Sequence, residues 1–386
     1  MFQRKCEVRV KRILPIFLYV SIFFLACCST GKGNIAPLNG EVEENLYAEG
    51  FEIAHYKGFS TISVVDPWDT AKVLQRYILV ERGKDLPDNL PEGTLIRTPV
   101  QNVIMYTTIH ASIWEELESL DGVVGICEPE YLTSGKALQM MEEGKIHDCG
   151  KAASPNVEKI MEVGGEIIIA SPFEHGGYGQ AEKLGIPIFE SADYMETHPL
   201  GRVEWMKVFG MLQGKRALAD SLFKVTMNNY NRLKALAANV EHRPRVMSER
   251  KYGSSWFIVG GASYIAQMYK DAGAEYIFSD NTETGSVPIA FETVFERGED
   301  SDIWIFKYAM PRPMLYSDLK GEYEPYAKFA PFRNRNIYIC NTVTTPYYEY
   351  IAIHPDYILA DYVKIFHPEL MPDYNFVCYE AMRDNP

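Results

Sequence analysis

The sequence predicts an α/β protein built from two lobes that a single long α-helix joins. Short apolar runs alternate with helical periodicity before residue 200, and the same alternation starts again at Pro244. Between these regions, residues 200–240 keep a helical pattern and contain no proline. Strands that alternate with helices form parallel sheets covered by helices. We therefore place an N-terminal α/β lobe at residues 49–200, a linking helical segment at 201–240 and a C-terminal α/β lobe at 241–386.

Four apolar runs predict the strands of the first lobe, and they lie at residues 103–106, 123–126, 166–170 and 186–189. A helical period connects the first two runs. Ser154 and Pro155 predict the start of a further helix, because Ser suits an N-cap and Pro suits the first helical position.

The linking segment carries apolar residues at helical spacing on both sides of Gly214. Trp205, Val208 and Phe209 form a stripe before this glycine, and the periodicity continues after it as far as Ala237. The second lobe has its clearest strands at residues 303–306 and 337–340.

Length and composition exclude several classes of protein. The chain has 386 residues, of which 47% are hydrophobic and 23% charged, and this suits two domains or one large bilobed domain. Its formal net charge is −14. An acidic chain of this kind is not expected to bind nucleic acid, which requires basic patches.

The N-terminus predicts export and a lipid anchor. Five basic residues precede an apolar stretch from Ile13 to Ala26, which is too short for a comfortable membrane span. The segment resembles a bacterial lipoprotein signal over residues 1–27, with Cys28 or Cys27 as the lipidated residue; an uncleaved anchor is the alternative. Removal of residues 1–26 leaves 33 basic and 51 acidic side chains, so the mature chain carries about −18.

The segment that follows, residues 28–48, is expected to be a polar tether. We expect the protein at the cell envelope, anchored by lipid to the membrane and facing the periplasm. Its other cysteines show no C-x-x-C spacing, so both free thiols and a disulfide remain open, and a zinc site is not expected. They are Cys127, Cys149, Cys340 and Cys378.

Known catalytic motifs do not occur in the chain. There is no phosphate-binding G-x-x-x-x-G-K-[ST] motif, no H-E-x-x-H zinc motif and no complete nucleophile elbow. The glycines at 176, 177 and 179 lack the spacing of a dinucleotide fingerprint. We expect no enzyme activity, no cofactor and no bound structural metal.

Several stretches in order resemble the substrate-binding lipoproteins of ABC importers for iron complexes or vitamin B12. In the first lobe they are residues 102–110, 117–125, 144–150 and 156–160. In the second lobe they are residues 259–266, 271–274, 302–305, 354–361 and 367–370. The resemblance covers about residues 95–370 and implies two Rossmann-like lobes bridged by one long helix. Glu166 departs from the pattern, because the family often has Pro-Asp there.

In open α/β sheets, ligands bind outside the carboxyl ends of the strands, so the residues that follow strands should line the cleft. In the first lobe these are Thr107, Thr108, His110, Tyr131, Pro172, Phe173, Glu174 and Tyr178; in the second they are Trp256, Tyr308, Met310 and Arg312. Tyr178, among glycines, is the strongest candidate. Packing or helix capping is the alternative for His110, and core packing is the alternative for Phe173 and Trp256.

The resemblance also implies a docking role for two glutamates. Glu158 and Glu292 each lie early in a predicted helix, and one such Glu on each lobe pairs with Arg residues of the permease in this family. Favourable interaction with the helix N-terminus is the alternative reason for their position.

The predicted function is delivery of a metal-chelate ligand to an ABC permease dimer with its ATPase. A corrinoid such as vitamin B12 is favoured over a ferric siderophore or haem, because Arg312 is the one basic residue among these post-strand positions. Arg250 and Lys251 are alternative sources of positive charge. A hydrolase or chelatase on the same scaffold, and a scavenger that meets no permease, are the other two hypotheses.

Overall fold

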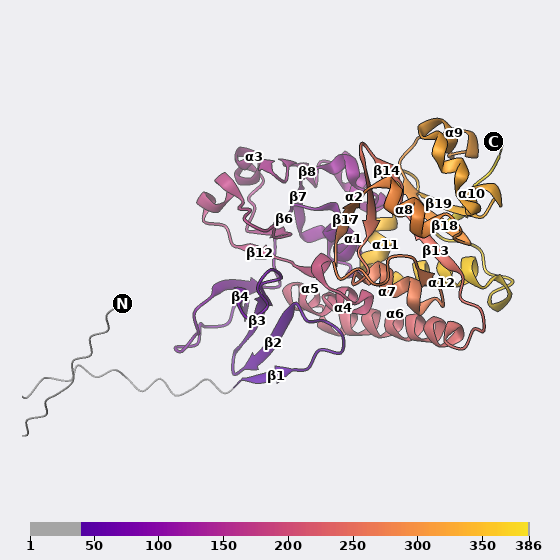
Figure 1. The fold of residues 1–386 in the computed structure, drawn as a ribbon. Coiled ribbons are helices and arrows are strands. Elements are labelled where there is room, and N and C mark those ends of the chain that lie inside the picture. Colours follow the sequence, from indigo (N-terminus) through magenta and orange to yellow (C-terminus); the bar gives the residue numbers. More distant parts are fainter. Residues whose placement is uncertain (1–39, 385–386) are drawn as a thin grey trace, which may run out of the picture. The chain divides into compact units, whose positions relative to one another are not determined.

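A computed structural model describes residues 40–384 of the chain (Figure 1). The signal segment at 1–27, both candidate lipidation residues Cys27 and Cys28, and most of the expected tether lie outside the described residues. Within the described range, no helix is both long enough and apolar enough to cross a membrane.

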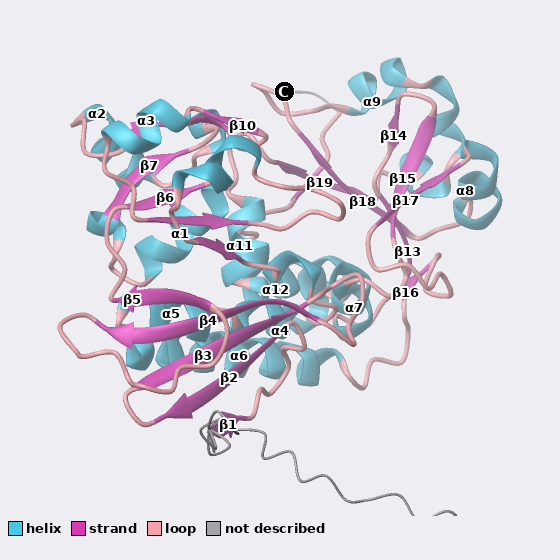
Figure 2. Cartoon of the chain, turned by 90° about the vertical axis from the view of Figure 1, so that its left-hand side faces the viewer, coloured by secondary structure: helices cyan, strands magenta, loops and turns pink. Residues whose placement is uncertain are grey.

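The described chain begins with a five-stranded sheet that the sequence analysis did not predict. Its strands pair in the order β1-β2-β3-β4-β5, antiparallel except for the β4–β5 pair. One face packs on the linking helices, where the Phe51 and Trp205 rings lie 5.0 Å apart. Its strands are β1 (Glu41–Glu43), β2 (Phe51–Tyr56), β3 (Phe59–Val65), β4 (Val73–Glu81) and β5 (Thr94–Thr98) (Figure 2).

This sheet shortens the expected tether. Residues 41–43 form β1, and the backbone amides of Leu46, Tyr47 and Ala48 donate hydrogen bonds to the buried carboxylate of Glu204. A carboxylate that accepts several amide hydrogen bonds holds the backbone firmly. The boundary at residue 48 is therefore too late, and the folded body begins by Glu41.

The N-terminal lobe holds a parallel sheet with strand order β12-β11-β6-β7-β8. The four predicted strands are all present. The lobe's strands are β6 (Val103–Met105), β7 (Val123–Ile126), β8 (His147–Asp148), β11 (Ile167–Ala170) and β12 (Ile188–Glu190), with a short β9–β10 ladder (Gly150–Lys151 and Ser154–Pro155). Its α-helices are α1 (Thr108–Glu116), α2 (Gly135–Glu142) and α3 (Val157–Glu162).

The predicted helix start at Ser154 and Pro155 is wrong. These two residues form β10, and α3 begins at Val157. Asn156 is its N-cap, and the Asn156 side chain accepts a hydrogen bond from the amide of Lys159. Asn caps a helix as well as Ser does. Pro155 instead pairs with Gly150 in the ladder, and this takes the two residues out of the helix.

The linking segment consists of three consecutive helices, α4 (Pro199–Glu204), α5 (Met206–Gln213) and α6 (Arg216–Ala237). Gly214 ends α5 with φ +65°, a left-handed conformation that favours glycine. The long helix is α6, with 22 residues. Ala219 at its start belongs to the core of the N-terminal lobe, while Tyr230 and Leu233 belong to the core of the C-terminal lobe. This confirms the predicted bridge.

The C-terminal lobe holds a second sheet in the order β16-β13-β18-β19-β20, parallel except at the β20 edge. A three-stranded sheet, β14-β15-β17, lies in the same lobe. The strands are β13 (Arg245–Ser248), β14 (Lys251–Tyr252), β15 (Ser255–Val259), β16 (Glu275–Tyr276), β17 (Ser286–Ile289), β18 (Ile303–Tyr308), β19 (Ile337–Asn341) and β20 (Glu380–Ala381). The helices are α7 (Tyr264–Asp271), α8 (Phe291–Gly298), α9 (Tyr316–Glu322), α10 (Ala330–Arg333), α11 (Tyr347–Ile353) and α12 (Pro355–Phe366).

The sequence left open whether four cysteines of the folded body form disulfides. Cys127, Cys149, Cys340 and Cys378 are buried free thiols. Burial raises the pKa of the Cys127 thiol to about 12 and that of Cys149 to about 11. Thiols with such pKa values are protonated at neutral pH and are poor nucleophiles.

Candidate functional site

A cavity of about 540 Å³ lies at the carboxyl edge of the N-terminal parallel sheet. Four strands supply its walls, because the carboxyl ends of parallel strands meet at one edge. Tyr106 and Thr107 follow β6, Glu128 follows β7, and two further groups of residues follow β11 and β12. The complete lining is Tyr106, Thr107, Ile109, His110, Glu128, Ala152, Ala153, Ser171, Phe173, Gly177, Tyr178, Asp193, Tyr194 and Arg202.

A buried charged group lies on one side of this cavity. The Asp193 carboxylate accepts hydrogen bonds from Arg202 Nε at 3.1 Å and from the Ser191 hydroxyl at 2.8 Å. His110 Nε2 lies 3.5 Å from Asp193 Oδ1. All three ionisable side chains are buried. Burial alone would raise the pKa of Asp193, but His110 and Arg202 outweigh it and lower the pKa to about 2.

Arg202 also reaches the second lobe. Its Nη1 donates a hydrogen bond to the Tyr264 hydroxyl at 3.2 Å, and its guanidinium carbon lies 5.8 Å from the Tyr264 ring centroid. Tyr264 is the first residue of α7. The same arginine therefore neutralises Asp193 at the cavity and contacts the C-terminal lobe.

Two residues of the cavity lining each carry one polar atom that has no hydrogen-bond partner among the described residues. These atoms are the Tyr106 hydroxyl and His110 Nδ1, and both atoms are buried. Tyr106 is 4% exposed and His110 is 1% exposed. A buried polar group without a partner is costly, so a bound molecule that supplies one gains affinity.

Aromatic side chains make up much of the remaining wall. Phe173 is 67% exposed, which is high for a large apolar side chain. Tyr178 donates a hydrogen bond to Glu190 at 3.1 Å and packs edge-to-face on Tyr106. The Tyr194 hydroxyl donates to the Pro172 carbonyl. Fixed rings beside an exposed phenylalanine give a surface that suits a large ligand with apolar faces.

The predicted residues of the first lobe divide into two groups. Thr107, His110, Phe173 and Tyr178 line the cavity together. Thr108 is buried at the start of α1, and Tyr131, Pro172 and Glu174 lie outside the lining. Tyr131 is 67% exposed, on the segment after β7.

The predicted ligand residues of the second lobe do not line this cavity. Trp256 is a core residue: it is fully buried, its ring stacks on Trp304 at 5.6 Å, and its Nε1 donates to the Ser248 carbonyl. Tyr308 is buried, and its hydroxyl accepts from the Met314 amide. Strands with alternating faces direct such residues into the core as readily as toward a ligand.

The other two residues of that prediction are engaged within the lobe. Arg312 forms a bidentate ion pair with Asp318, at 2.7 and 2.8 Å, and Met310 packs against the core. The Arg312 guanidinium therefore has its charge compensated by a neighbouring carboxylate.

The two predicted docking glutamates occupy matched positions. Glu158 is the second residue of α3 and Glu292 is the second residue of α8, and both side chains are exposed. Within residues 40–384, neither forms an ion pair. Both carboxylates are thus available to a partner.

The sequence analysis missed Asp193 and Arg202. Asp193 follows the predicted strand at 186–189, so the rule that found Phe173 after its strand would also have found Asp193. Arg202 lies within a mostly apolar helical segment, where a buried arginine needs a carboxylate partner. An arginine in such a segment is therefore a signal for a buried ion pair.

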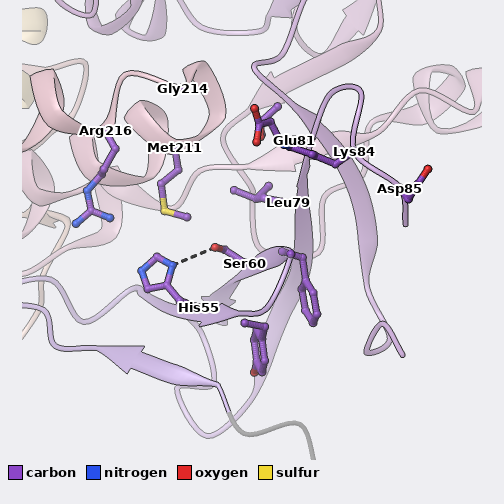
Figure 3. A pocket seen from close by; sticks show the side chains of 13 residues that line it. His55, Ser60, Leu79, Glu81, Lys84, Asp85, Met211, Gly214 and Arg216 are labelled. Atoms are coloured by element: carbon purple, nitrogen blue, oxygen red, sulfur yellow. Dashed lines mark hydrogen bonds between the residues drawn. The ribbon is translucent and has the colours of Figure 1, made fainter. Parts of the chain in front are cut away.

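A second cavity, of about 770 Å³, lies between the N-terminal sheet and the turn from α5 to α6 (Figure 3). His55 Nδ1 lies 3.0 Å from the Ser60 hydroxyl there, and Arg216 pairs with Glu43. The cavity lies away from the carboxyl edge of either parallel sheet. We therefore assign the candidate site to the first cavity.

Two parallel-sheet lobes, a helix that enters both cores and a cavity at a carboxyl sheet edge define a bilobed binding protein. Residues 103–344 match the family described as periplasmic binding protein. Because the match covers more than half of the chain, the chain belongs to the periplasmic binding protein family.

Two relatives of this chain are named lipoproteins. An uncharacterized lipoprotein of Methanocaldococcus jannaschii is 27% identical over 314 residues, which are 76% of this chain and 73% of that protein. A second uncharacterized lipoprotein of this organism is 24% identical over 377 residues, 92% of this chain and 94% of that protein. The second match therefore extends into the N-terminal sheet, whereas the family match begins after it.

Solved structures share the fold at low sequence identity. A TroA-like periplasmic binding protein from Veillonella parvula has a TM-score of 0.56 and 16% identity, with 75% of this chain and 96% of that chain covered. The periplasmic vitamin B12 binding protein of Vibrio cholerae has a TM-score of 0.53 and 12% identity, with 71% and 99% covered. These likenesses establish the fold.

Proposed function

We propose that this protein is the lipid-anchored solute-binding protein of an ABC importer, and that it is a receptor rather than an enzyme. Its ligand is a large metal chelate, with a corrinoid such as vitamin B12 favoured over a ferric siderophore or haem. Membership of the periplasmic binding protein family supports the receptor class. Two relatives that are named lipoproteins support the anchor.

The observation that carries the ligand assignment is the charge of the cavity lining. Arg202 is the one lysine or arginine among the described lining residues, and Asp193 compensates it at 3.1 Å. Glu128 adds a negative charge to the same wall. An anionic iron complex needs uncompensated Arg or Lys side chains, and a mature chain of about −18 opposes its approach.

The aromatic wall supports the same ligand. A corrinoid is a wide macrocycle with apolar faces and a rim of neutral amide groups. Phe173, Tyr178 and Tyr194 offer ring surface at the cavity, and Phe173 is more than half exposed. Burial of such surface stabilises the complex by about 25 cal/mol per Å² of apolar area.

Calorimetric titration of the detergent-solubilised full-length protein tests the assignment. We expect cyanocobalamin to bind, and haem and a ferric hydroxamate siderophore to bind weakly or to give no heat. Phe173→Ala should weaken cyanocobalamin binding about tenfold, as expected for loss of about 1–2 kcal/mol of aromatic contact. Phe257→Ala is the matched control, because Phe257 is an exposed phenylalanine outside the cavity.

The outcomes separate the ligand from the class of protein. Clear binding of the iron complex without cyanocobalamin binding would replace the corrinoid by an iron chelate and leave the receptor class intact. Chemical conversion of the bound molecule would contradict the receptor assignment and support a hydrolase or chelatase.

A further inference from the structure

His110 presents one ring nitrogen to a carboxylate and leaves the other without a partner. Its Nε2 lies 3.5 Å from Asp193 Oδ1, and its Nδ1 is a buried atom with no hydrogen-bond partner among residues 40–384. The ring also packs on Phe209, with centroids 5.5 Å apart. Helix α1 and this contact fix the ring at the cavity.

The position of the ring proton follows from the Asp193 carboxylate. An ionised carboxylate only accepts hydrogen bonds, so it favours the tautomer with the proton on the facing Nε2. In this tautomer the ring lone pair lies on Nδ1. Because His110 belongs to the cavity lining, we take this unpartnered nitrogen as the acceptor that a ligand group meets.

Burial restricts which part of a ligand can reach that acceptor. His110 is 1% exposed, and the cavity measures about 540 Å³. A narrow arm can enter such a space, whereas coordination of the metal would require the His110 ring to project from the wall toward the face of the macrocycle. A peripheral hydrogen-bond donor is thus a better match than direct coordination of the metal.

We propose that a primary carboxamide arm of the ligand enters this cavity and donates an N–H hydrogen bond to His110 Nδ1. The proposal rests on the proposed function, because corrinoids carry several such arms around their ring. It assigns His110 as the residue that distinguishes a carboxamide from a carboxylate. The charged side chains of the lining are Asp193, Arg202 and Glu128.

Electrostatics determines that a carboxamide arm binds more tightly than a carboxylate arm. A carboxylate arm has no hydrogen to donate, and it would bring a second negative charge beside Asp193, whose own charge Arg202 already compensates. A site built to hydrogen-bond one group rejects the analogue that lacks it, since its buried polar atom then stays unpaired.

The test varies the ligand and the protein together. Cyanocobalamin is compared with its separate monocarboxylic acids, in each of which one peripheral amide is replaced by a carboxylate. We expect one isomer to bind the full-length protein at least tenfold more weakly than cyanocobalamin. His110→Phe should weaken cyanocobalamin binding about tenfold and should add little to the loss for that isomer, because both changes remove the same hydrogen bond.

His110→Gln serves as the conservative variant. Its amide group can donate to Asp193 while its carbonyl accepts from the ligand arm, so we expect it to retain most of the affinity. Thermal unfolding of each variant checks the fold. Should His110→Phe fail to fold, the isomer series on the unchanged protein still tests the discrimination.

Three results would overturn the inference. Equal affinities for all isomers would show that the protein recognises no single arm. Tighter binding of a carboxylate isomer would show that His110 donates a hydrogen bond to the arm and does not accept one. A histidine-dependent change in the visible spectrum of the bound corrinoid would show coordination of the metal. Absence of cyanocobalamin binding by the unchanged protein would instead reject the ligand of the proposed function, and the arm contact with it.

Discussion

Asp193 is the residue that organises the charge at the cavity. It is almost fully buried, and it contacts Arg202, Ser191 and His110 at the same time. A buried ion pair adds little net stability, but removal of one partner leaves the other charge uncompensated. Asp193 therefore matters both to the stability of the lobe and to the neutrality of the site.

Asp193→Asn should reduce the free energy of unfolding by about 3 kcal/mol at neutral pH, because Arg202 then stays buried without a carboxylate. Urea denaturation measures this change in the free energy of unfolding. Asp318→Asn is the control, since Asp318 and Arg312 form a more exposed pair, and its cost should be no more than about 1 kcal/mol. Equal losses for both variants would contradict the special role of the buried pair.

The same carboxylate predicts a pH dependence of stability. Its pKa falls from 3.8 in the unfolded chain to about 2 in the folded protein. The stabilisation is therefore fully present above about pH 4 and is lost as the pH falls toward 2, with a total of about 2 kcal/mol. The difference in unfolding free energy between the unchanged protein and Asp193→Asn should shrink over this interval, and a constant difference would disprove the link.

At the scale of elements, the strands of the parallel sheets were predictable from the sequence and the start of α3 was not. Short apolar runs such as 167–170 are buried on both faces, so composition alone identifies them. The start of α3 depends instead on whether Pro155 pairs with Gly150, a short antiparallel contact that the helix-capping rule alone does not predict. The same local rule for residues after strands identified four of the fourteen residues that line the cavity.

The turn between α5 and α6 offers a test of an element boundary. Gly214 has φ +65°, and a Cβ placed there would lie 3.7 Å from Pro99, so space is not limiting. Gly214→Ala should cost about 1 kcal/mol of unfolding free energy for the left-handed backbone alone. Gly135→Ala is the control: Gly135 begins α2 without a positive φ or a neighbour within 4 Å, and its change should stay within about 0.5 kcal/mol. Thermal or urea unfolding measures the stability of both variants. Equal losses for Gly214→Ala and Gly135→Ala would contradict a specific cost of the left-handed conformation at Gly214.

For the whole molecule, the N-terminal sheet is the feature that sequence reasoning missed. Its strands mix polar and apolar residues, and its packing partner, Trp205, lies more than a hundred residues later in the chain. The strands pair with their neighbours in sequence, but buried and exposed residues do not alternate strictly along β3 and β4, so the two-residue period of a half-buried strand is weak. The amides of Leu46 to Ala48 donate hydrogen bonds to Glu204, so residues 46–48 belong to the folded body.

The anchor itself is testable by substitution. Cys27→Ser together with Cys28→Ser should release the protein from the membrane fraction, because neither thiol is then available to carry the proposed lipid anchor. Each single variant should identify the residue that carries the lipid. Fractionation and detergent partition measure the result, and a double variant that stays in the membrane fraction would reject the lipoprotein prediction.

The last prediction concerns the permease. Glu158 and Glu292 are both exposed second residues of their helices, one on each lobe, so two fixed negative charges face solvent at equivalent places in α3 and α8. Charge pairs at both lobes would fix the register of the body on a dimeric permease.

Glu158→Arg with Glu292→Arg should stop ligand uptake and leave ligand affinity unchanged, since neither residue lines the cavity. Glu52→Arg with Glu275→Arg reverses two other exposed glutamates and should leave uptake intact. Unimpaired uptake by the first pair at native protein levels would refute the docking role, and loss of uptake in both pairs would show that net charge, rather than position, governs the encounter.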